Sequence, residues 1–505
     1  MTKQEIGRLI DIEKRIKEMA KEMCLLTTDI LFEIVSAQKV LEGMSYMFPV
    51  NYSHWTFGRD YEKHRTIYEN TGSGIPYEQV WNFDVPRAYL VETNPFALNV
   101  LILAHVYGHV DYFLANRYLQ HGRSFSNVAE EARNAAVRFL KYEERYGQKE
   151  VEKVIDAGMS IMWHQNPDPF FEEQDEEVVR ERLVDLERAK LERTRDIRSE
   201  FKKPETQGEV EKIERRLEHL LAKTPPEPNY DILNYIIKRS PKPLKPWMID
   251  VLMVVRNQAR CLAPNRRTKG GDEGWATYCH IRMVNKLCQE GLLTSDEHGT
   301  AMKFHSGVTR ELKSGFNWYR IYLALLENIK ERWDKGRFGK EYEEEQDCHK
   351  RSVWDTKTGL GDQKVLEVRA LYSDRMLVEE FFTDDFIREQ QIYIWMGIPH
   401  EDGSVDYIIA EDDPSVIREE IKQMCTHYGL PQIRVENGNF NGQGHLLLKH
   451  ILTGFELDRP YMNATLEKIF YLWGKKVFLE TMVDGKSQTI SRDYQKKNGK
   501  NGKKS

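Results

Sequence analysis

The chain has 505 residues, of which 40% are apolar and 30% are charged, and 74 basic against 80 acidic residues give it a net charge of −6. This length predicts roughly two to four domains. The composition is that of a globular protein and excludes collagen, mucin-like stalks and a wholly disordered chain. A weakly acidic balance provides no overall field that attracts nucleic acid, so we expect no nucleic-acid partner.

Neither the N-terminus nor any later segment has the pattern of a membrane protein. The first residues, MTKQEIGRLIDIEK, carry charges every few positions and leave no apolar core for a signal peptide. No stretch approaches the ~18 apolar residues of a spanning helix. The six cysteines include no C-x-x-C pair and do not form a disulfide framework. We therefore expect a cytoplasmic protein with reduced thiols and no integral membrane segment.

Helical periodicity dominates the chain before about residue 360. Apolar residues recur near 3.6 spacing over 3–43, which predicts one long amphipathic helix. Residues 45–95 are rich in aromatics and turn formers and predict a packed irregular segment, after which Asn94-Pro95 opens a further helix. Residues 172–223 hold 29 charged side chains and predict a charged helical hairpin or a flexible insertion.

After about residue 360 the pattern changes from helical to alternating. Several candidate strands, the first over 366–372, and two candidate helices predict a small α+β domain over 361–492. A mainly helical domain over 1–350 precedes it, and the lysine-rich residues 493–505 predict a basic, disordered tail. The expected fold class is therefore α+β, with a large, mainly helical N-terminal region followed by a small α+β domain.

The segment HVYGH places His105 and His109 four residues apart. On a helix such residues lie on one face, one turn apart, so two imidazoles can bind one metal ion. Chance gives about 0.4 such pairs for 15 histidines in this length, so the spacing alone is weak evidence. Both histidines share a face with apolar residues, where imidazoles without partners would cost stability. A metal ion or a buried carboxylate would each supply the partner.

A second candidate segment is GGDEGWATYCH, residues 270–280. Gly270 and Gly271 predict a loop, Asp272 a helix N-cap, and Glu273 a position in the first helical turn. Glu273 and His280 share a face but are seven residues apart, a rise of about 10.5 Å, so one ion cannot readily bind both. We expect Glu273 to be the ligand and His280 to support the ligands or touch a substrate. The alternative is a capped surface helix whose glutamate interacts with the helix dipole.

Three further side chains are weaker candidates. Glu143 and Glu144 lie near the end of a predicted helix that stops at Gly147, and ordinary surface charge explains such residues more often than a site does. His54 lies beside large aromatic residues in a predicted loop, where packing is the commoner explanation.

Several separated motifs carry a resemblance to a known family. They are YSHWTFGRDYE at 52–62, LAHVYGHVDYF at 103–113, YEERYG at 142–147, DEGWATYCHIRM at 272–283 and YLWGKKVFLETMVDGK at 471–486. In this order they resemble the stage V sporulation protein R (SpoVR) family over about residues 40–492. The resemblance implies a role in sporulation, in forming the spore cortex, a modified peptidoglycan layer, although relatives also occur in bacteria that form no spores. It also implies a PrkA-type serine protein kinase as a partner.

The order of the two candidate segments is similar to the metal site of some zinc peptidases, in which two histidines and a later glutamate hold zinc. The similarity implies a zincin-like centre with His105, His109 and Glu273 as ligands. In those enzymes a glutamate after the first histidine activates water, but Val106 occupies that position here and cannot take a proton. A hydrolase would then need another acid. The candidates for that role are Asp111, Glu143 and Glu144.

Two functions are left open by this sequence. The first is a SpoVR-like cytoplasmic protein of cortex formation or envelope regulation, in which a metal or polar centre holds the helices together. The second is a metal-dependent hydrolase of a peptide or amide bond, in a peptidoglycan precursor, with a displaced general base. Contacts that support the ligands or touch a substrate are expected from His280, Tyr107, Tyr278 and His54.

Overall fold

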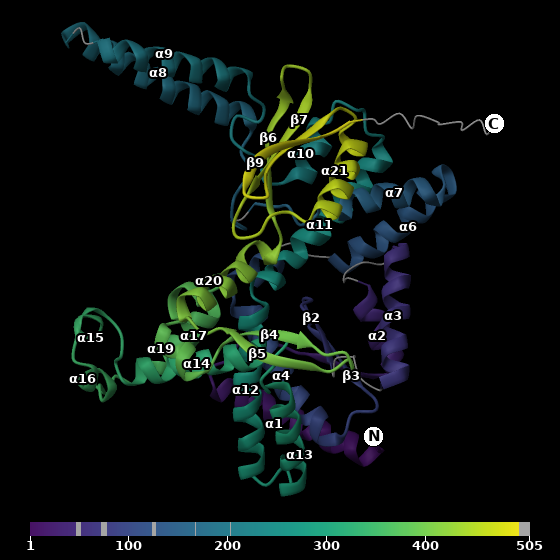
Figure 1. Ribbon diagram of the computed structural model, residues 1–505. Coiled ribbons are helices and arrows are strands. Elements are labelled where there is room, and N and C mark those ends of the chain that lie inside the picture. Colours follow the sequence, from purple (N-terminus) through teal and green to yellow (C-terminus); the bar gives the residue numbers. More distant parts are fainter. Residues whose placement is uncertain (47–51, 72–77, 124–127, 167, 202–203, 494–505) are drawn as a thin grey trace. The chain divides into compact units, whose positions relative to one another are not determined.

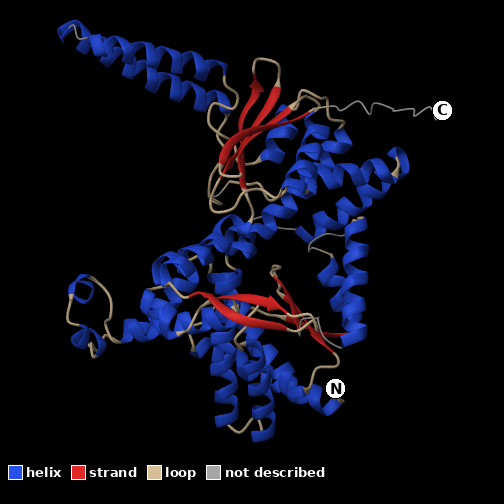
Figure 2. Ribbon diagram, viewed as in Figure 1, coloured by secondary structure: helices blue, strands red, loops and turns tan. Residues whose placement is uncertain are grey.

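The computed structural model describes the chain from residue 1 to residue 493, except for residues 47–51, 72–77, 124–127, 167 and 202–203 (Figure 1). The chain divides into two compact units. Unit 1 is formed by residues 1–133 and 261–429, and unit 2 by residues 134–260 and 430–505. Helices predominate and the sheets are small, as Figure 2 shows, so the α+β class is confirmed.

Two helices, α4 (Phe96–Ala115) and α12 (Lys269–Gln289), pack along each other at the centre of unit 1. Helix α4 is buried continuously from Phe96 to Phe113, because a helix that is apolar on all sides has to be enclosed. The helices around this pair are α1 (Lys3–Glu22), α13 (Ser295–Val308), α14 (Trp318–Asp334), α17 (Gly361–Leu371) and α18 (Asp374–Phe381).

A glycine sets the spacing of the central pair. A Cβ atom at Gly108 of α4 would lie 2.6 Å from the Cα of Ala276 and 3.2 Å from the Cβ of Cys279, both on α12. No side chain larger than a hydrogen fits there without moving the backbone, so α4 and α12 come closest at this level. Gly108 lies between the two histidines of the HVYGH segment, and the close approach brings both of them against α12.

A three-stranded sheet in the order β1-β3-β2 also belongs to unit 1. Strand β1 (Leu31–Val35) runs parallel to β3 (Arg87–Val91), with Leu31 opposite Arg87. Strand β2 (Glu78–Trp81) runs antiparallel to β3, with Glu78 opposite Leu90. Both β2 and β3 contact α4, so this register decides which β2 side chain faces the helix.

The remaining elements of unit 1 surround this core or project from it. The strands β4 (Ile394–Pro399) and β5 (Val405–Glu411) form a separate antiparallel hairpin. The other helices are α2 (Ala37–Ser45), α3 (Trp55–Thr71), α5 (Arg117–Arg123), α15 (Lys340–Glu344), α16 (Cys348–Ser352), α19 (Asp384–Glu389), α20 (Pro414–Cys425) and the 3-10 helix η1 (Thr426–Gly429).

Unit 2 contains a four-stranded sheet in the order β6-β7-β8-β9. Its strands are β6 (Gln432–Phe440), β7 (His445–Ile451), β8 (Val477–Val483) and β9 (Lys486–Arg492). Strands β7 and β8 are parallel and are joined by the crossover helix α21 (Arg459–Trp473); the other pairs are antiparallel. Two further helices are α7 (Gln148–Met159) and α10 (Ile232–Arg239), while α6 (Val128–Tyr146) and α11 (Pro246–Arg267) contribute residues to both units.

The charged segment of unit 2 forms two helices, α8 (Glu176–Phe201) and α9 (Pro204–Ala222), that pack on each other. A small cluster of Leu191, Val210 and Ile213 lies between them. Their other faces are charged and exposed, as the composition of this segment predicts.

Three local predictions are wrong. The helix expected over 3–43 ends at Glu22, because Cys24 adopts a left-handed backbone conformation (φ 59°) and the chain then pairs with β3 as strand β1. The segment 45–95, expected to be irregular, contains α3, β2 and β3. The strand expected over 366–372 is part of α17, whose Val365 and Val368 are buried three residues apart.

The predicted domain boundaries, 1–350 and 361–492, stay a prediction. In the structure, residues 361–429 group with unit 1 and residues 430–505 with unit 2. The basic tail expected over 493–505 lies, after Asp493, outside the described residues.

Membrane-spanning potential is confined, among the residues that the structure describes, to helix α4. By length and apolarity α4 could cross a membrane, but 94% of its apolar window is buried inside the protein. The buried core helix of a globular unit can be as long and as apolar as a membrane-spanning helix, and α4 is such a core helix.

Candidate metal centre

The two histidines of α4 face a glutamate of α12. His105 and His109 are 5% and 6% exposed, and their ring centroids lie 4.6 Å apart. The Nε2 atom of His105 is 3.4 Å from Oε2 of Glu273, and the Nε2 atom of His109 is 3.5 Å from the same oxygen. The structure therefore brings together the three residues that the sequence singles out as ligands.

The two carboxylate oxygens of Glu273 differ in their partners. Oε1 pairs with the ammonium group of Lys269, one helical turn earlier. Oε2 is buried and, within the described part of the chain, forms no hydrogen bond. Burial alone would raise the pKa of Glu273, but the charges of His109 and Lys269 outweigh it and hold the pKa well below its ordinary value. A charged oxygen thus lies buried between two imidazole nitrogens, while the cation nearest to it, Lys269, pairs with the other oxygen of the same carboxylate.

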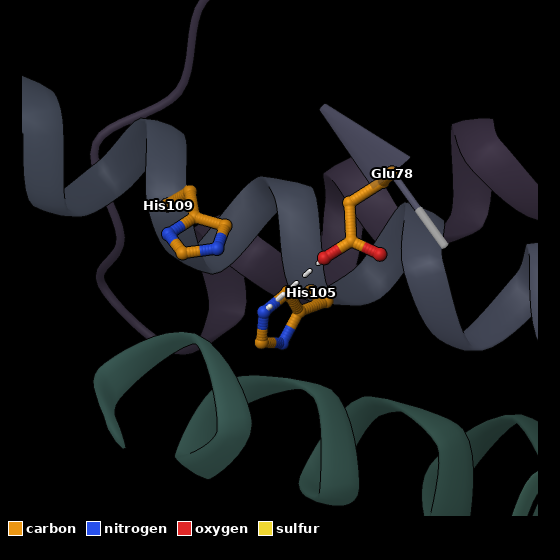
Figure 3. A group of neighbouring side chains, drawn as sticks. All are labelled: Glu78, His105 and His109. Atoms are coloured by element: carbon orange, nitrogen blue, oxygen red, sulfur yellow. Dashed lines mark ion pairs between the residues drawn. The ribbon is translucent and has the colours of Figure 1, made fainter. Parts of the chain in front are cut away.

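A second carboxylate reaches the histidines from strand β2. Oε1 of Glu78 lies 3.8 Å from Nε2 of His105, and Figure 3 shows its side chain pointing toward the histidine pair. One ligand atom from each of Glu78, His105 and His109 fits within 4.8 Å of the others. A glutamate and two histidines of this centre could therefore hold a metal ion.

Both imidazoles are fixed through their Nδ1 atoms. Nδ1 of His109 lies 2.7 Å from Oδ1 of Asp272, and Nδ1 of His105 lies 2.9 Å from Nδ1 of His280. His280 continues to His305 through a 2.9 Å contact between its Nε2 and Nδ1 of His305. Burial and the neighbouring His105 and His305 hold the pKa of His280 well below its ordinary value. When each Nδ1 donates outward, each Nε2 keeps a lone pair directed at Glu273, which is the tautomer that a metal ligand requires.

The centre carries an excess of negative charge when its histidines are neutral. The three carboxylates of Glu78, Asp272 and Glu273 face the single ammonium of Lys269. Burial lowers the pKa of His109, but the charges of Asp272 and Glu273 outweigh it and raise the pKa to about 10. A proton on His109 offsets part of the excess, and a divalent cation in place of that proton would offset it fully.

The spacing of the donor atoms fits a tetrahedral ion. Two ligands at zinc distances of about 2.1 Å lie about 3.4 Å apart when the angle at the ion is tetrahedral. The two distances from Nε2 to Oε2 are 3.4 and 3.5 Å. Two imidazoles and one carboxylate are the donor set of catalytic zinc sites, which leave a fourth position open.

The open side of the centre faces a pocket of about 850 Å³, a volume in the range of substrate-binding cavities. Its walls include aromatic side chains of Trp81, Phe83 and Phe113, and the hydroxyl-bearing ring of Tyr319 from α14. Burial, the charge of Glu273 and a hydrogen bond to its carboxylate raise the pKa of Tyr319, so this hydroxyl keeps its proton as a donor beside Glu273.

Asp111, a candidate base, lies outside this cluster. It is fully buried and accepts hydrogen bonds from the backbone amide of Leu26 (2.6 Å), from Nε1 of Trp275 (2.8 Å) and from Arg369. Burial raises its pKa, and the paired Arg369 opposes that rise. These contacts account for Asp111 as a carboxylate that joins α4, α12 and α17.

The remaining candidates are distributed over both units. Tyr107 donates a hydrogen bond to Glu13, and Tyr278 stacks on Trp275 with ring centroids 5.4 Å apart. His54 lies 2.7 Å from the hydroxyl of Thr56 at the start of α3. None of these contacts involves the histidine pair. Two further candidates, Glu143 and Glu144, belong to α6 within unit 2.

The sequence also predicts Asp272 as the N-cap of α12, which is wrong. Helix α12 begins earlier, at Lys269, and Asp272 lies inside it. The carboxylate of Asp374 on α18 caps the helix instead, because its two oxygens accept the amides of Gly270 and Gly271, each at 2.8 Å. Because α12 begins at Lys269, Asp272 lies within its first turn, and its carboxylate contacts His109.

Glu78 and Tyr319 are two pocket residues that the sequence did not predict. Glu78 reaches the histidines only through the register of β2 against β3, and neither residue lies in a recognisable motif. No sequence pattern pointed to either residue, because their contacts depend on packing between distant segments.

Nearly the whole of this chain, including α4 and α12, matches a known family. The chain matches the family described as "SpoVR like protein" over residues 3–430 and the "SpoVR-like C-terminal domain" over residues 431–484. It therefore belongs to the SpoVR family, as the motifs suggest. It is similar to the Escherichia coli (strain K12) protein named "Uncharacterized protein YcgB", with 26% identity over 502 residues, covering 94% of this chain and 92% of that protein. No solved structure matches the chain.

Proposed function

We propose that the centre between α4 and α12 binds a divalent metal ion, zinc by preference, and that the protein is a metal-dependent hydrolase of peptide or amide bonds. The observation that carries the proposal is the buried Oε2 of Glu273. It forms no hydrogen bond among the described residues, faces the Nε2 atoms of His105 and His109, and borders an open pocket.

In this proposal His105, His109 and Glu273 are the ligands and Glu78 is the general base. Glu273 is the better ligand because its side chain is 8% exposed and one oxygen is already fixed by Lys269. The Glu78 side chain is 19% exposed and lines the pocket. It stands beside the histidines from strand β2 and supplies the proton acceptor that Val106 cannot.

In this mechanism the metal ion and the surrounding side chains have separate roles. A bound zinc ion would lower the pKa of water to about 7 and polarise a carbonyl group. Glu78 would accept the proton of the attacking water and return it to the leaving amine. The protonated hydroxyl of Tyr319 would donate a hydrogen bond to the oxygen on which negative charge develops. Aromatic walls around the pocket would exclude water from the bound substrate.

The proposed substrate is a peptide of a peptidoglycan precursor. This rests on the cortex role that family membership implies, and on the mixed polar and aromatic lining of the pocket. On the same family association, we propose a PrkA-type serine protein kinase as the partner and the cytoplasm as the location.

A structural centre is the second candidate. The raised pKa of His109, about 10, favours it, because a protonated imidazole between Asp272 and Glu273 would offset the buried charge without any metal. In that case the histidines and carboxylates would join α4 to α12 and β2, and the protein would act in envelope regulation by binding rather than by catalysis.

Metal content and turnover separate the two candidates. Purified wild-type protein, His109→Ala and Glu78→Gln are measured by mass spectrometry of the metals and with synthetic peptidoglycan stem peptides. We expect about one zinc ion per chain in the wild type and in Glu78→Gln, and none in His109→Ala. Glu78→Gln should lower kcat about 10²- to 10⁴-fold. Glu130→Gln, an exposed carboxylate of the same pocket, is the matched control and should keep full turnover.

A metal-free wild-type protein that folds normally would contradict the proposal and leave the structural centre. Retained metal with undiminished turnover in Glu78→Gln would overturn the assignment of the base alone.

A further inference from the structure

The hairpin of β4 and β5 exposes several apolar side chains of unit 1 close together. Every residue from 396 to 410 is exposed, including Met396 (50%), Ile408 (43%) and Ile409 (47%). The two strands pair only with each other in the described part of the chain, so each has one edge whose backbone groups lack a strand partner. A two-stranded hairpin with free edges and exposed apolar side chains is a site for pairing with another strand.

The two faces of the hairpin differ in character. Directly opposite residues share a face in an antiparallel pair, and the register pairs Trp395 with Ile409, Gly397 with Tyr407 and Pro399 with Val405. These pairs form an apolar face. The other face carries the pairs Ile394 with Glu411, Met396 with Ile408 and Ile398 with Asp406, so acidic side chains occupy both of its ends.

Acidic side chains outnumber basic ones on the hairpin, where Asp406 contacts the imidazole of His400 (2.8 Å) and Lys313 lies over the ring of Trp395. Between residues 394 and 413 the sequence contains no Lys or Arg and six acidic residues: Glu401, Asp402, Asp406, Glu411, Asp412 and Asp413. Strand β5 contributes Asp406 and Glu411, and its residues from 405 to 410 are exposed without exception. Strand β4, by contrast, is anchored at Ile394, which packs against the core of unit 1.

We propose that the free edge of β5 binds an extended polypeptide segment in which apolar residues alternate with Lys or Arg. An added strand places alternate side chains on the two faces. Its apolar side chains would extend the face of Tyr407 and Ile409, and its basic side chains would lie beside Asp406 and Glu411 on the other face.

A second copy of the chain is disfavoured as the occupant. Pairing β5 with β5 would bring the same acidic residues of two chains against each other, and like charges across neighbouring strands are destabilising. Charge complementarity therefore selects a basic partner strand. This proposal is independent of the metal centre and does not rest on catalysis.

The test uses the full-length protein and a fluorescein-labelled synthetic peptide of about eight residues, the length of an ordinary strand, that alternates Val with Lys. Fluorescence anisotropy measures its binding. A peptide of the same length that alternates Val with Glu is the control. We expect saturable binding of the basic peptide, weakened by added salt, and no binding of the acidic peptide.

Two variants locate the site. Ile409→Lys changes the apolar face and Ile408→Lys the acidic one; both side chains are exposed, so folding should be kept, as circular dichroism can verify. Each should weaken binding of the basic peptide about fivefold or more, through lost cross-strand contact and added repulsion. Val416→Lys on α20, a site of matching exposure (45%) outside the hairpin, should bind as the wild type does.

Three results would overturn the proposal. They are the absence of saturable binding by the basic peptide, equal binding in all three variants, and self-association of the chain that disappears in Ile409→Lys on sedimentation analysis. The last result would make a second copy the occupant.

Discussion

Asp111 lies two residues beyond His109 on α4, yet its contacts differ from those of the histidines. Its carboxylate is buried and bound by Arg369, Trp275 and the amide of Leu26. Proximity in sequence to a metal motif therefore did not make it part of the pocket. Removing one member of a buried ion pair leaves the other charge buried without a partner, so stability is the property that tests the role of Asp111.

We predict that Asp111→Asn destabilises the protein. Arg369, whose side chain is 9% exposed, would lose its charged partner, and breaking a buried pair in this way costs about 3–5 kcal/mol. Urea unfolding measures the loss, and metal content should not change. The control is Asp11→Asn on the exposed side of α1, with an expected change within about 0.5 kcal/mol. Unchanged stability with abolished turnover would instead identify Asp111 as the base.

Asp374 gives a prediction for pH dependence. Burial raises its pKa to about 7, although the amides of Gly271 and Gly270 oppose the rise and Asp272 adds to it. The folded state therefore binds this proton more tightly than the unfolded state, whose carboxyl titrates near 3.8. Between these values the contribution of Asp374 to the free energy of unfolding falls as pH rises, by up to about 1.4 kcal/mol per pH unit.

The variant Asp374→Asn cannot titrate at this position, so its stability should decline less steeply between pH of about 4 and 7. The variant should also be less stable than the wild type at the lower end, because its amide nitrogen cannot accept a hydrogen bond from Gly270 or Gly271. Denaturant unfolding across this range measures both effects. Equal slopes in the two proteins would contradict the titration of Asp374.

Among the elements, the pair α4 and α12 determines whether the centre exists. The ligands come from both helices, and their distances depend on the close approach at Gly108. A glycine is required at this crossing because a larger side chain would push the two helices apart, and not because it makes the backbone flexible.

We predict that Gly108→Ala separates the two helices. The new methyl group would lie 2.6 Å from the Cα of Ala276, which forces a backbone shift and costs about 1–3 kcal/mol. Because ligand atoms must be placed within tenths of an ångström, zinc affinity should also fall. Thermal unfolding and a competition titration with a zinc chelator measure the two effects.

Gly7→Ala on α1 is the control for Gly108→Ala. A Cβ atom at Gly7 would meet no atom within 4 Å, so helix propensity alone acts and should stabilise the protein by up to about 1 kcal/mol. Unaltered stability in Gly108→Ala would show that the helices can move apart without cost.

The sequence predicted elements whose pattern is local. The buried helix of His105 and His109 follows from its continuous apolar face, and its start follows from Asn94-Pro95. The facing glutamate, Glu273, was predicted from its place in the first helical turn of its segment and from its distance along the helix to His280, and the resemblance to zinc peptidases implied the same ligand. For these features the local sequence pattern was sufficient to predict the structure.

The features that the sequence did not predict depend on distant partners. Strand β1 interrupts the expected long helix because it pairs with β3, some fifty residues later in the chain. Residues 366–372 alternate like a strand, but burial of Val365 and Val368 against unit 1 selects a helix. Glu78 reaches the centre through a sheet register that no local pattern specifies.

At the scale of the whole molecule, the site lies within one unit. The chain passes from unit 1 to unit 2, returns to unit 1 and ends in unit 2, since each unit is built from two segments. All of the proposed ligands, the base Glu78 and the pocket belong to unit 1. A ligand that binds only the folded form stabilises the unit that holds its site.

We therefore predict that removing the metal destabilises unit 1 selectively. Bound at about 100 times its Kd, an ion contributes about 2.7 kcal/mol, and a chelator such as EDTA would remove this contribution. Hydrogen exchange followed by mass spectrometry should then show lost protection in α4 and α12, while α21 and the sheet of β6–β9 in unit 2 keep theirs. The same chelator should change nothing in His109→Ala, which has already lost the ion. Equal loss of protection in both units, or an identical response of the variant, would show that the chelator acts elsewhere than on the centre between α4 and α12.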